Sequence, residues 1–108
     1  MATVRKVGQI PFSCVKLSEA DFKDKAAVYV ILNVNDNGEW KVLDVGQSAE
    51  MGISIDTKSR AAAWKEQCEP SKIQVGSYSM PTASHKKGDR FALEHKVRRQ
   101  YNPPCGQR

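Results

Sequence analysis

The stretch from Ala27 to Ser48 reads as a β-hairpin, and it constrains the fold more than any other part of the sequence. Residues Val28–Val34 are mostly β-branched or aliphatic, as in a strand that is buried on at least one side. Asn37 and Gly38 follow, and this pair is a strong short-range turn signal because both residues tolerate positive φ. The segment Glu39–Val45 then predicts the returning strand.

Counting back from the turn predicts which residues of the hairpin face each other. With Asn37 and Gly38 as the central turn residues, Tyr29 faces Gly46 and Ile31 faces Asp44. Side chains alternate along a strand, so one face is expected to carry Tyr29, Ile31, Asn33, Val42 and Asp44. The other face is expected to carry Val30, Leu32, Val34, Leu43 and Val45. A phenol and a carboxylate on one face of an apolar hairpin are a first indication of a site.

Length and cysteine content limit the class of protein. The 108 residues allow one domain with one modest core. No apolar run approaches the about 20 residues of a membrane span, and no apolar signal segment is visible, so we expect no membrane partner. The three cysteines, Cys14, Cys68 and Cys105, have no CxxC spacing. They are interpreted as reduced thiols of a cytoplasmic protein, not as a disulfide framework or a zinc site.

The net charge of +5 is concentrated in the second half of the chain. Residues 1–55 contain six Lys/Arg against seven Asp/Glu, a net of −1, whereas residues 56–108 contain eleven against five, a net of +6. A one-sided basic surface attracts phosphate backbones. A solvated basic face that keeps the protein soluble accounts for the same charge, so both interpretations stay open at this point.

The first part of the chain predicts little regular structure. Residues 1–26 are interpreted as an N-terminal arm, which is loose around Gly8 and Pro11 and leads into a short strand or extended segment near Phe12–Leu17. A short helix is expected to begin at Ser18, which is a favourable N-cap residue.

Residues 27–108 are expected to form the folded domain. After the hairpin, the patterns predict a helix over 58–68, a third strand over 72–80 and a last helix over 89–101. Trp64 lies on the apolar stripe of the first of these helices and should pack on the sheet. The expected fold class is α/β, a small three-stranded antiparallel sheet flanked by helices.

The last helix combines an apolar side with charged residues. Glu94 lies beside the apolar side, four residues from both Arg90 and Arg98, so a surface ion-pair ladder is one complete explanation for it. The best basic patch consists of Lys86, Lys87, Lys96, Arg98 and Arg99.

The segment from Ala27 to Gly106 resembles the GIY-YIG endonuclease superfamily. Ala27-Val28-Tyr29 stands where the family has Gly-Ile-Tyr, and Asp44-Val45-Gly46, followed by Gln47, stands where it has Tyr-Ile-Gly. Arg60 matches the helix arginine of the family, and Glu94 matches its metal-binding glutamate. Asn102-Pro103-Pro104 is similar to the proline-containing turn that follows that helix.

This resemblance implies hydrolysis of DNA phosphodiester bonds. Tyr29 or its partner would activate water, Arg60 would neutralise the scissile phosphate, and Glu94 would hold one Mg²⁺ or Mn²⁺ ion. Asp44 would take a catalytic place in the second motif, and we hypothesise that it shares the metal with Glu94. The resemblance also favours contact with the DNA backbone through Gln47 and the basic patch.

The sequence departs from the family pattern at several positions. Asp44 replaces the tyrosine of the second motif, Trp64 replaces a histidine or tyrosine, and Gly106 stands where asparagine is common. Two hypotheses follow. The chain is either a small metal-dependent endonuclease or a catalytically degenerate domain that binds nucleic acid or a protein without cutting.

Overall fold

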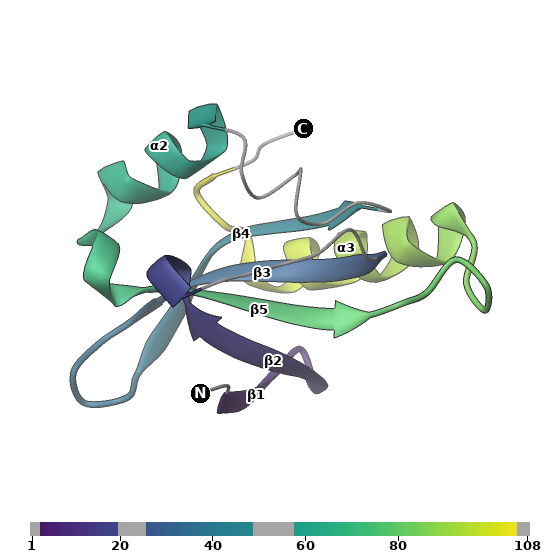
Figure 1. The fold of residues 1–108 in the computed structure, drawn as a ribbon, viewed down its shortest axis with the longest axis horizontal. Helices are drawn as coiled ribbons and strands as arrows, with labels where there is room; N and C mark the ends of the chain where they lie inside the picture. The colour runs from purple at the N-terminus through teal and green to yellow at the C-terminus, as the bar shows by residue number, and fades with distance from the viewer. Residues whose placement is uncertain (1–2, 20–25, 49–57, 106–108) are drawn as a thin grey trace.

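The structure is a computed structural model that describes residues 3–19, 26–48 and 58–105, with the backbone alone for residues 58–61. Figure 1 shows its strands and helices along the chain. They are β1 (Thr3–Val7), β2 (Ile10–Lys16), η1 (Leu17–Glu19), β3 (Ala27–Val34), β4 (Trp40–Ser48), α2 (Lys58–Gln67), η2 (Pro70–Lys72), β5 (Ile73–Ser79) and α3 (Lys87–Tyr101). No helix in these described ranges is long and apolar enough to cross a membrane.

The sheet has five antiparallel strands in the order β1-β2-β5-β3-β4. The predicted three-stranded sheet flanked by helices is therefore wrong. The three expected strands are present as β3, β4 and β5, with β3 in the centre of that group, but β2 adds to the free side of β5 and β1 adds to β2.

The two additional strands come from the N-terminal arm: β2 overlaps the short strand or extended segment expected near Phe12–Leu17, whereas β1 was not predicted. Gly8 and Gln9 both adopt positive φ, 61° and 68°, and form a tight turn between β1 and β2. Beyond the turn, Phe12 and Cys14 point into the core while Ser13 is exposed, which is the period-two pattern of a strand. Two signals hid this hairpin: a glutamine is unusual at positive φ, and Pro11 disfavours a strand. The predicted helix from Ser18 onward falls mostly outside the described residues, apart from η1.

The predicted register of the main hairpin is confirmed in the half that is far from the turn, and it is wrong in the half next to the turn. Tyr29 pairs with Gly46, and Ile31 pairs with Asp44, as counted from the sequence. A bulge then shifts the register, so Leu32 pairs with Val42.

The length of the turn explains why the predicted register is wrong next to it. It is longer than two residues: Gly38 alone has positive φ, and its N–H donates to Asn35 O at 2.9 Å. Because Leu43 is the extra residue of the bulge, Val42 and Leu43 lie on the faces opposite to those predicted.

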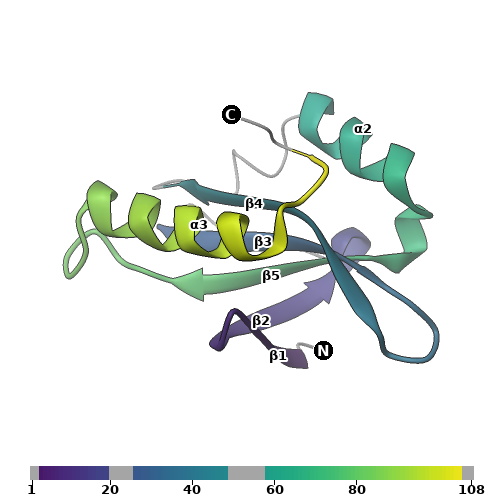
Figure 2. The ribbon, with the colours of Figure 1, turned by 180° about the vertical axis from the view of Figure 1, so that it is seen from behind.

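The part of the sheet formed by β3 and β4 is buried on both faces. Helix α3 covers one face and packs Val97 and Leu93 against Val30, Leu32 and their neighbours. Helix α2 covers the other face with the fully buried Trp64, together with Cys105 beyond the end of α3. Figures 1 and 2 show the two helices from opposite sides of the sheet. The strands β3 and β4 are therefore enclosed by elements that come later in the chain.

Helix α3 begins two residues before its predicted start. Asp89 is not the N-cap residue; it lies in the first turn, and its carboxylate accepts from the backbone N–H of Lys86 at 2.9 Å. At the other end Asn102 adopts a left-handed conformation, φ 46°, and its N–H donates to Arg98 O. The turn from β1 to β2 touches this end, where Gly8 N–H donates to the Tyr101 hydroxyl at 2.9 Å.

Candidate functional site

Tyr29 and Gly46 form the closest contact between the two motifs predicted from the sequence. Tyr29 is fully buried on β3 and its ring lies against Gly46 on β4. A Cβ atom at position 46 would lie 2.4 Å from the Tyr29 hydroxyl oxygen and 2.3 Å from Cζ, so glycine is required there. The first tyrosine and the second glycine of the predicted motifs are thus in direct contact.

Asp44 is buried on β4 and is held by hydrogen bonds to both carboxylate oxygens. Its Oδ2 accepts from the indole N–H of Trp64 on α2 at 2.9 Å. Its Oδ1 accepts from Arg98 Nη2 on α3 at 3.0 Å and from Val45 N–H at 2.8 Å. Only 1% of Asp44 is exposed. The carboxylate therefore joins the two helices to the strand between them.

Arg98 is the centre of this polar cluster. In addition to Asp44, its Nε lies 3.4 Å from Oε2 of Glu94, one helical turn earlier on α3. Its Nη1 donates to Cys105 O at 3.2 Å, and its Nη2 donates to Val45 O on the edge strand β4. The side chain of Arg98 is 14% exposed. The guanidinium thus reaches two carboxylates and two carbonyls, and these contacts offset part of the cost of burying the charged groups.

The hypothesis of a metal shared by Asp44 and Glu94 does not fit this arrangement. The guanidinium of Arg98 contacts both carboxylates, so a fixed positive charge already lies where a shared cation would have to bind. Glu94 has no exposed surface, which leaves no room for the several waters that Mg²⁺ retains. Within the described part of the chain, no three His, Cys, Asp or Glu side chains group in a way that suits a metal ion.

Arg60 and Gly106 cannot be placed in this site. Arg60 is on α2, as predicted, but its side chain lies outside the described residues, as does all of Gly106.

The predicted basic patch is divided among three places. Arg98 points inward to the polar cluster. Lys86 and Lys87 are at the start of α3, where the Lys87 ammonium lies 5.5 Å from the centre of the Phe91 ring. Lys96 and Arg99 lie on the exposed side of the helix. These five residues therefore do not form one surface.

The side chain of Gln47 is hydrogen-bonded to Arg90, a residue that was not predicted to belong to the site. Its side-chain oxygen accepts from Nε of Arg90 at 3.3 Å, and Arg90 is 3% exposed. Arg90, Glu94 and Arg98 are spaced four residues apart and form one row of α3 along strand β4. This spacing was visible in the sequence, but it does not tell a surface row from a buried one.

Two further residues, Trp64 and Cys105, make polar contacts in the site that the sequence did not predict. Trp64 was expected to be an apolar packing residue, and its N–H is also a hydrogen-bond donor to Asp44. Cys105 closes the site from the C-terminal side: its N–H donates to Leu43 O at 2.9 Å, and its thiol lies 3.7 Å from Ala63 O on α2.

Comparison with known proteins adds no relative to this picture, since no protein-family model, curated protein or solved structure matches the chain.

Proposed function

We propose that this chain is a catalytically degenerate GIY-YIG-like domain that binds a nucleic-acid phosphate backbone without cutting it. The observation that carries the proposal is the position of Arg98, which contacts both Asp44 and Glu94. These two residues stand at the second-motif and glutamate positions of the predicted catalytic set. Their carboxylates are bound to a protein cation instead of being presented to a substrate or a metal ion.

The burial of the motif residues supports the same conclusion. A general base or nucleophile-activating group must come within hydrogen-bond distance of water or substrate. Tyr29 and Glu94 have no exposed surface, and Asp44 has 1%. The carboxylate of Asp44 joins β4 to α2 through Trp64 and to α3 through Arg98, which is a structural task.

Binding of a phosphate backbone is supported by the charge that remains outside this cluster. The excess of Lys and Arg lies in the second half of the sequence, and the side chains of Lys86, Lys87, Lys96 and Arg99 are exposed. Exposed cations attract nucleic acid without regard to sequence, in a manner that salt weakens.

A second candidate is the endonuclease activity that the resemblance implies, with Mg²⁺ or Mn²⁺ as cofactor. It is favoured by the contact between Tyr29 and Gly46, because this contact brings the two predicted motifs together. It also requires Glu94 to become accessible, which breaks its ion pair with Arg98.

Incubation with supercoiled plasmid separates the two candidates. The wild-type protein and Glu94→Gln are compared with Mg²⁺ and with Mn²⁺, and circular dichroism verifies that the variant is folded. We expect intact plasmid whose gel mobility is retarded by the wild-type protein, with the retardation lost between about 50 and 200 mM salt. Cutting by the wild type that disappears in Glu94→Gln would establish the endonuclease instead. Absence of retardation at the lower salt concentration would exclude binding.

A further inference from the structure

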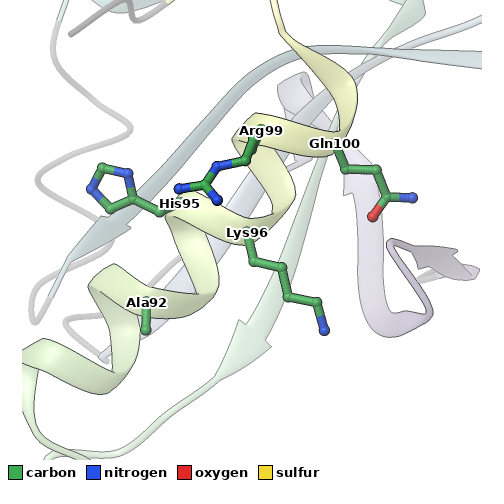
Figure 3. A pocket seen from close by; sticks show the side chains of 5 residues that line it. All are labelled: Ala92, His95, Lys96, Arg99 and Gln100. Carbon is green, nitrogen blue, oxygen red and sulfur yellow. The ribbon is translucent and has the colours of Figure 1, made fainter.

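The exposed side of α3 has a composition that the polar cluster does not explain. Five residues line a shallow hollow there, at spacings of three, four, seven and eight residues along the helix. We call them the α3 outer face; they are Ala92, His95, Lys96, Arg99 and Gln100 (Figure 3). All five are exposed. Two of them, Lys96 and Arg99, belong to the basic patch predicted from the sequence, and no role was predicted for His95.

Among the residues that the structure describes, none compensates the positive charge of this face. None of the five described residues that line the hollow is a carboxylate. The two acidic residues of α3 are directed elsewhere, because Asp89 accepts from Lys86 N–H and Glu94 is buried beside Arg98. Within the described residues neither Lys96 nor Arg99 forms an ion pair. The face therefore presents two fixed cations, an imidazole and an amide to solvent.

The arrangement of these donors suits a single phosphodiester backbone. Arg99 extends on the side of His95, whereas Lys96 and Gln100 point to the other side of the helix (Figure 3). The donors thus extend to both sides of the helix, and the small Ala92 completes the lining of the hollow. The face covers eight residues of rise, about 12 Å, which is enough for a few consecutive phosphates.

The same composition favours duplex over single-stranded nucleic acid. Single strands are bound by combining cations with aromatic rings on which bases stack. Of the five described residues that line the hollow, His95 alone carries a ring. Contacts limited to phosphates are most favourable where phosphates are densest, and duplex DNA carries one charge per about 1.7 Å of axis.

We infer that the α3 outer face is the surface that contacts the phosphate backbone of duplex DNA. This inference rests on the proposed binding function and locates it away from the motif residues. Lys96 and Arg99 supply the charge, while His95 and Gln100 donate hydrogen bonds to phosphate oxygens. Arg98, although it is adjacent in sequence, takes no part because it is bound within the polar cluster.

The test measures fluorescence anisotropy of a labelled duplex DNA of random sequence. The variant K96Q/R99Q is compared with K41Q/K65Q, which removes two exposed lysines from β4 and α2 and so produces the same change in net charge. We expect K96Q/R99Q to weaken binding about tenfold and to reduce the slope of log K against log salt by about 1.8. The control pair should change affinity by less than about twofold. Thermal unfolding verifies that both variants are folded.

Each other outcome has a defined meaning. Equal losses in the two double variants would overturn the inference, since attraction would then be diffuse, and would leave the proposed binding function standing. If the wild-type protein binds but K96Q/R99Q binds equally well, the inference is likewise overturned and the proposed binding function stands. Tighter binding of a single strand or of an RNA duplex than of the DNA duplex would overturn the choice of partner. If the wild type binds none of these probes at low salt, the proposed function fails together with the inference.

Discussion

At the scale of single residues, Asp44 determines how the polar cluster is built. Its carboxylate receives a hydrogen bond from the indole of Trp64 and an ion pair from Arg98, so it joins groups 20 and 54 residues away. Two departures from the expected family pattern, Asp44 and Trp64, are thus partners of each other. A carboxylate and an indole N–H satisfy one another in a site where a lone carboxylate would be costly.

Replacing Asp44 by alanine should be strongly destabilising. The change leaves the guanidinium of Arg98 with one carboxylate fewer and leaves the Trp64 N–H without this acceptor. Removal of one member of a buried ion pair costs about 3–5 kcal/mol, and we expect a loss in this range in urea denaturation. Asp36→Ala, at an exposed turn position, is the control and should stay within about 0.5 kcal/mol of the wild type. A similar small effect of Asp44→Ala would contradict the assigned role.

Gly46→Ala should also destabilise the protein, through overpacking. The new methyl group would overlap the buried Tyr29 ring, which is fixed on β3. Overpacking costs about 1–3 kcal/mol, measured by thermal or urea unfolding. The penalty should be smaller in a Tyr29→Leu background, because the two positions are in contact.

Gly88→Ala is the matched control for Gly46. A Cβ at position 88 meets no atom within 4 Å, and the residue is in α3. The substitution should be neutral or stabilising by about 0.5–1 kcal/mol. Equal penalties at the two glycines would show that the Tyr29 contact does not decide the effect.

At the scale of elements, the N-terminal hairpin is an integral part of the sheet. It extends the sheet beyond β5 and contributes Val7, Phe12 and Cys14 to the core that also contains Val97 of α3. Gly8 N–H is bonded to the Tyr101 hydroxyl, so the tip of the hairpin is fixed to the C-terminal end of α3. These contacts link the first and last elements of the described chain.

Phe12→Ala tests this role. Phe12 has no exposed surface, and loss of a buried phenyl ring costs about 3–5 kcal/mol. Val4 on the same hairpin is 67% exposed, so Val4→Ala should change the free energy of unfolding by no more than about 0.5 kcal/mol. If urea denaturation gave similar values for both, the hairpin would not belong to the cooperative core.

Helix α3 shows how one element serves three purposes. Its Leu93 and Val97 pack on the sheet, its row of Arg90, Glu94 and Arg98 binds along β4, and its outer face is basic. A period of 3.6 residues separates these three sides. The sequence predicted the apolar side, but it assigned Arg98 to the basic side with Lys96 and Arg99.

At the scale of the whole molecule, the two cores on either side of the sheet enclose thiols whose ionisation affects folding. Burial raises the pKa of the Cys14 thiol above its ordinary value of 9.0, partly opposed by the charge of Arg5. Burial likewise raises the pKa of Cys68, partly opposed by Lys72. In both cases the folded state favours the protonated thiol.

Stability should therefore fall as the pH rises above about 9. In that range the unfolded thiols lose protons while the folded ones retain them, so the unfolded state binds fewer protons and gains stability. Urea midpoints measured from pH 8 upward should decline, and the decline should be smaller in Cys14→Ala, whose lower overall stability is taken as its own reference. An identical pH profile in this variant would assign the decline to other groups.

The sequence predicted the parts of the fold that depend on neighbours along the chain. The strands β3 and β5 and the helices α2 and α3 lie within a few residues of their predicted positions, and Trp64 is buried as its stripe required. The predicted pairing of Tyr29 with Gly46 is correct because the bulge at Leu43 offsets the longer turn. The turn between β1 and β2 and the pairing of these strands were not predicted, because Pro11 and a glutamine at positive φ are poor strand and turn signals.

What the sequence by itself determined is the periodicity of each element, since alternation and helical spacing are properties of consecutive residues. What only the tertiary structure decided is which groups the charged side chains contact and which of them face solvent. Arg98 and Arg99 are equivalent in sequence, yet one is bound to Asp44 across 54 residues and the other faces solvent. A guanidinium binds wherever the folded chain places carboxylates and free strand carbonyls within its reach, and that placement exists only after the sheet and helices have packed.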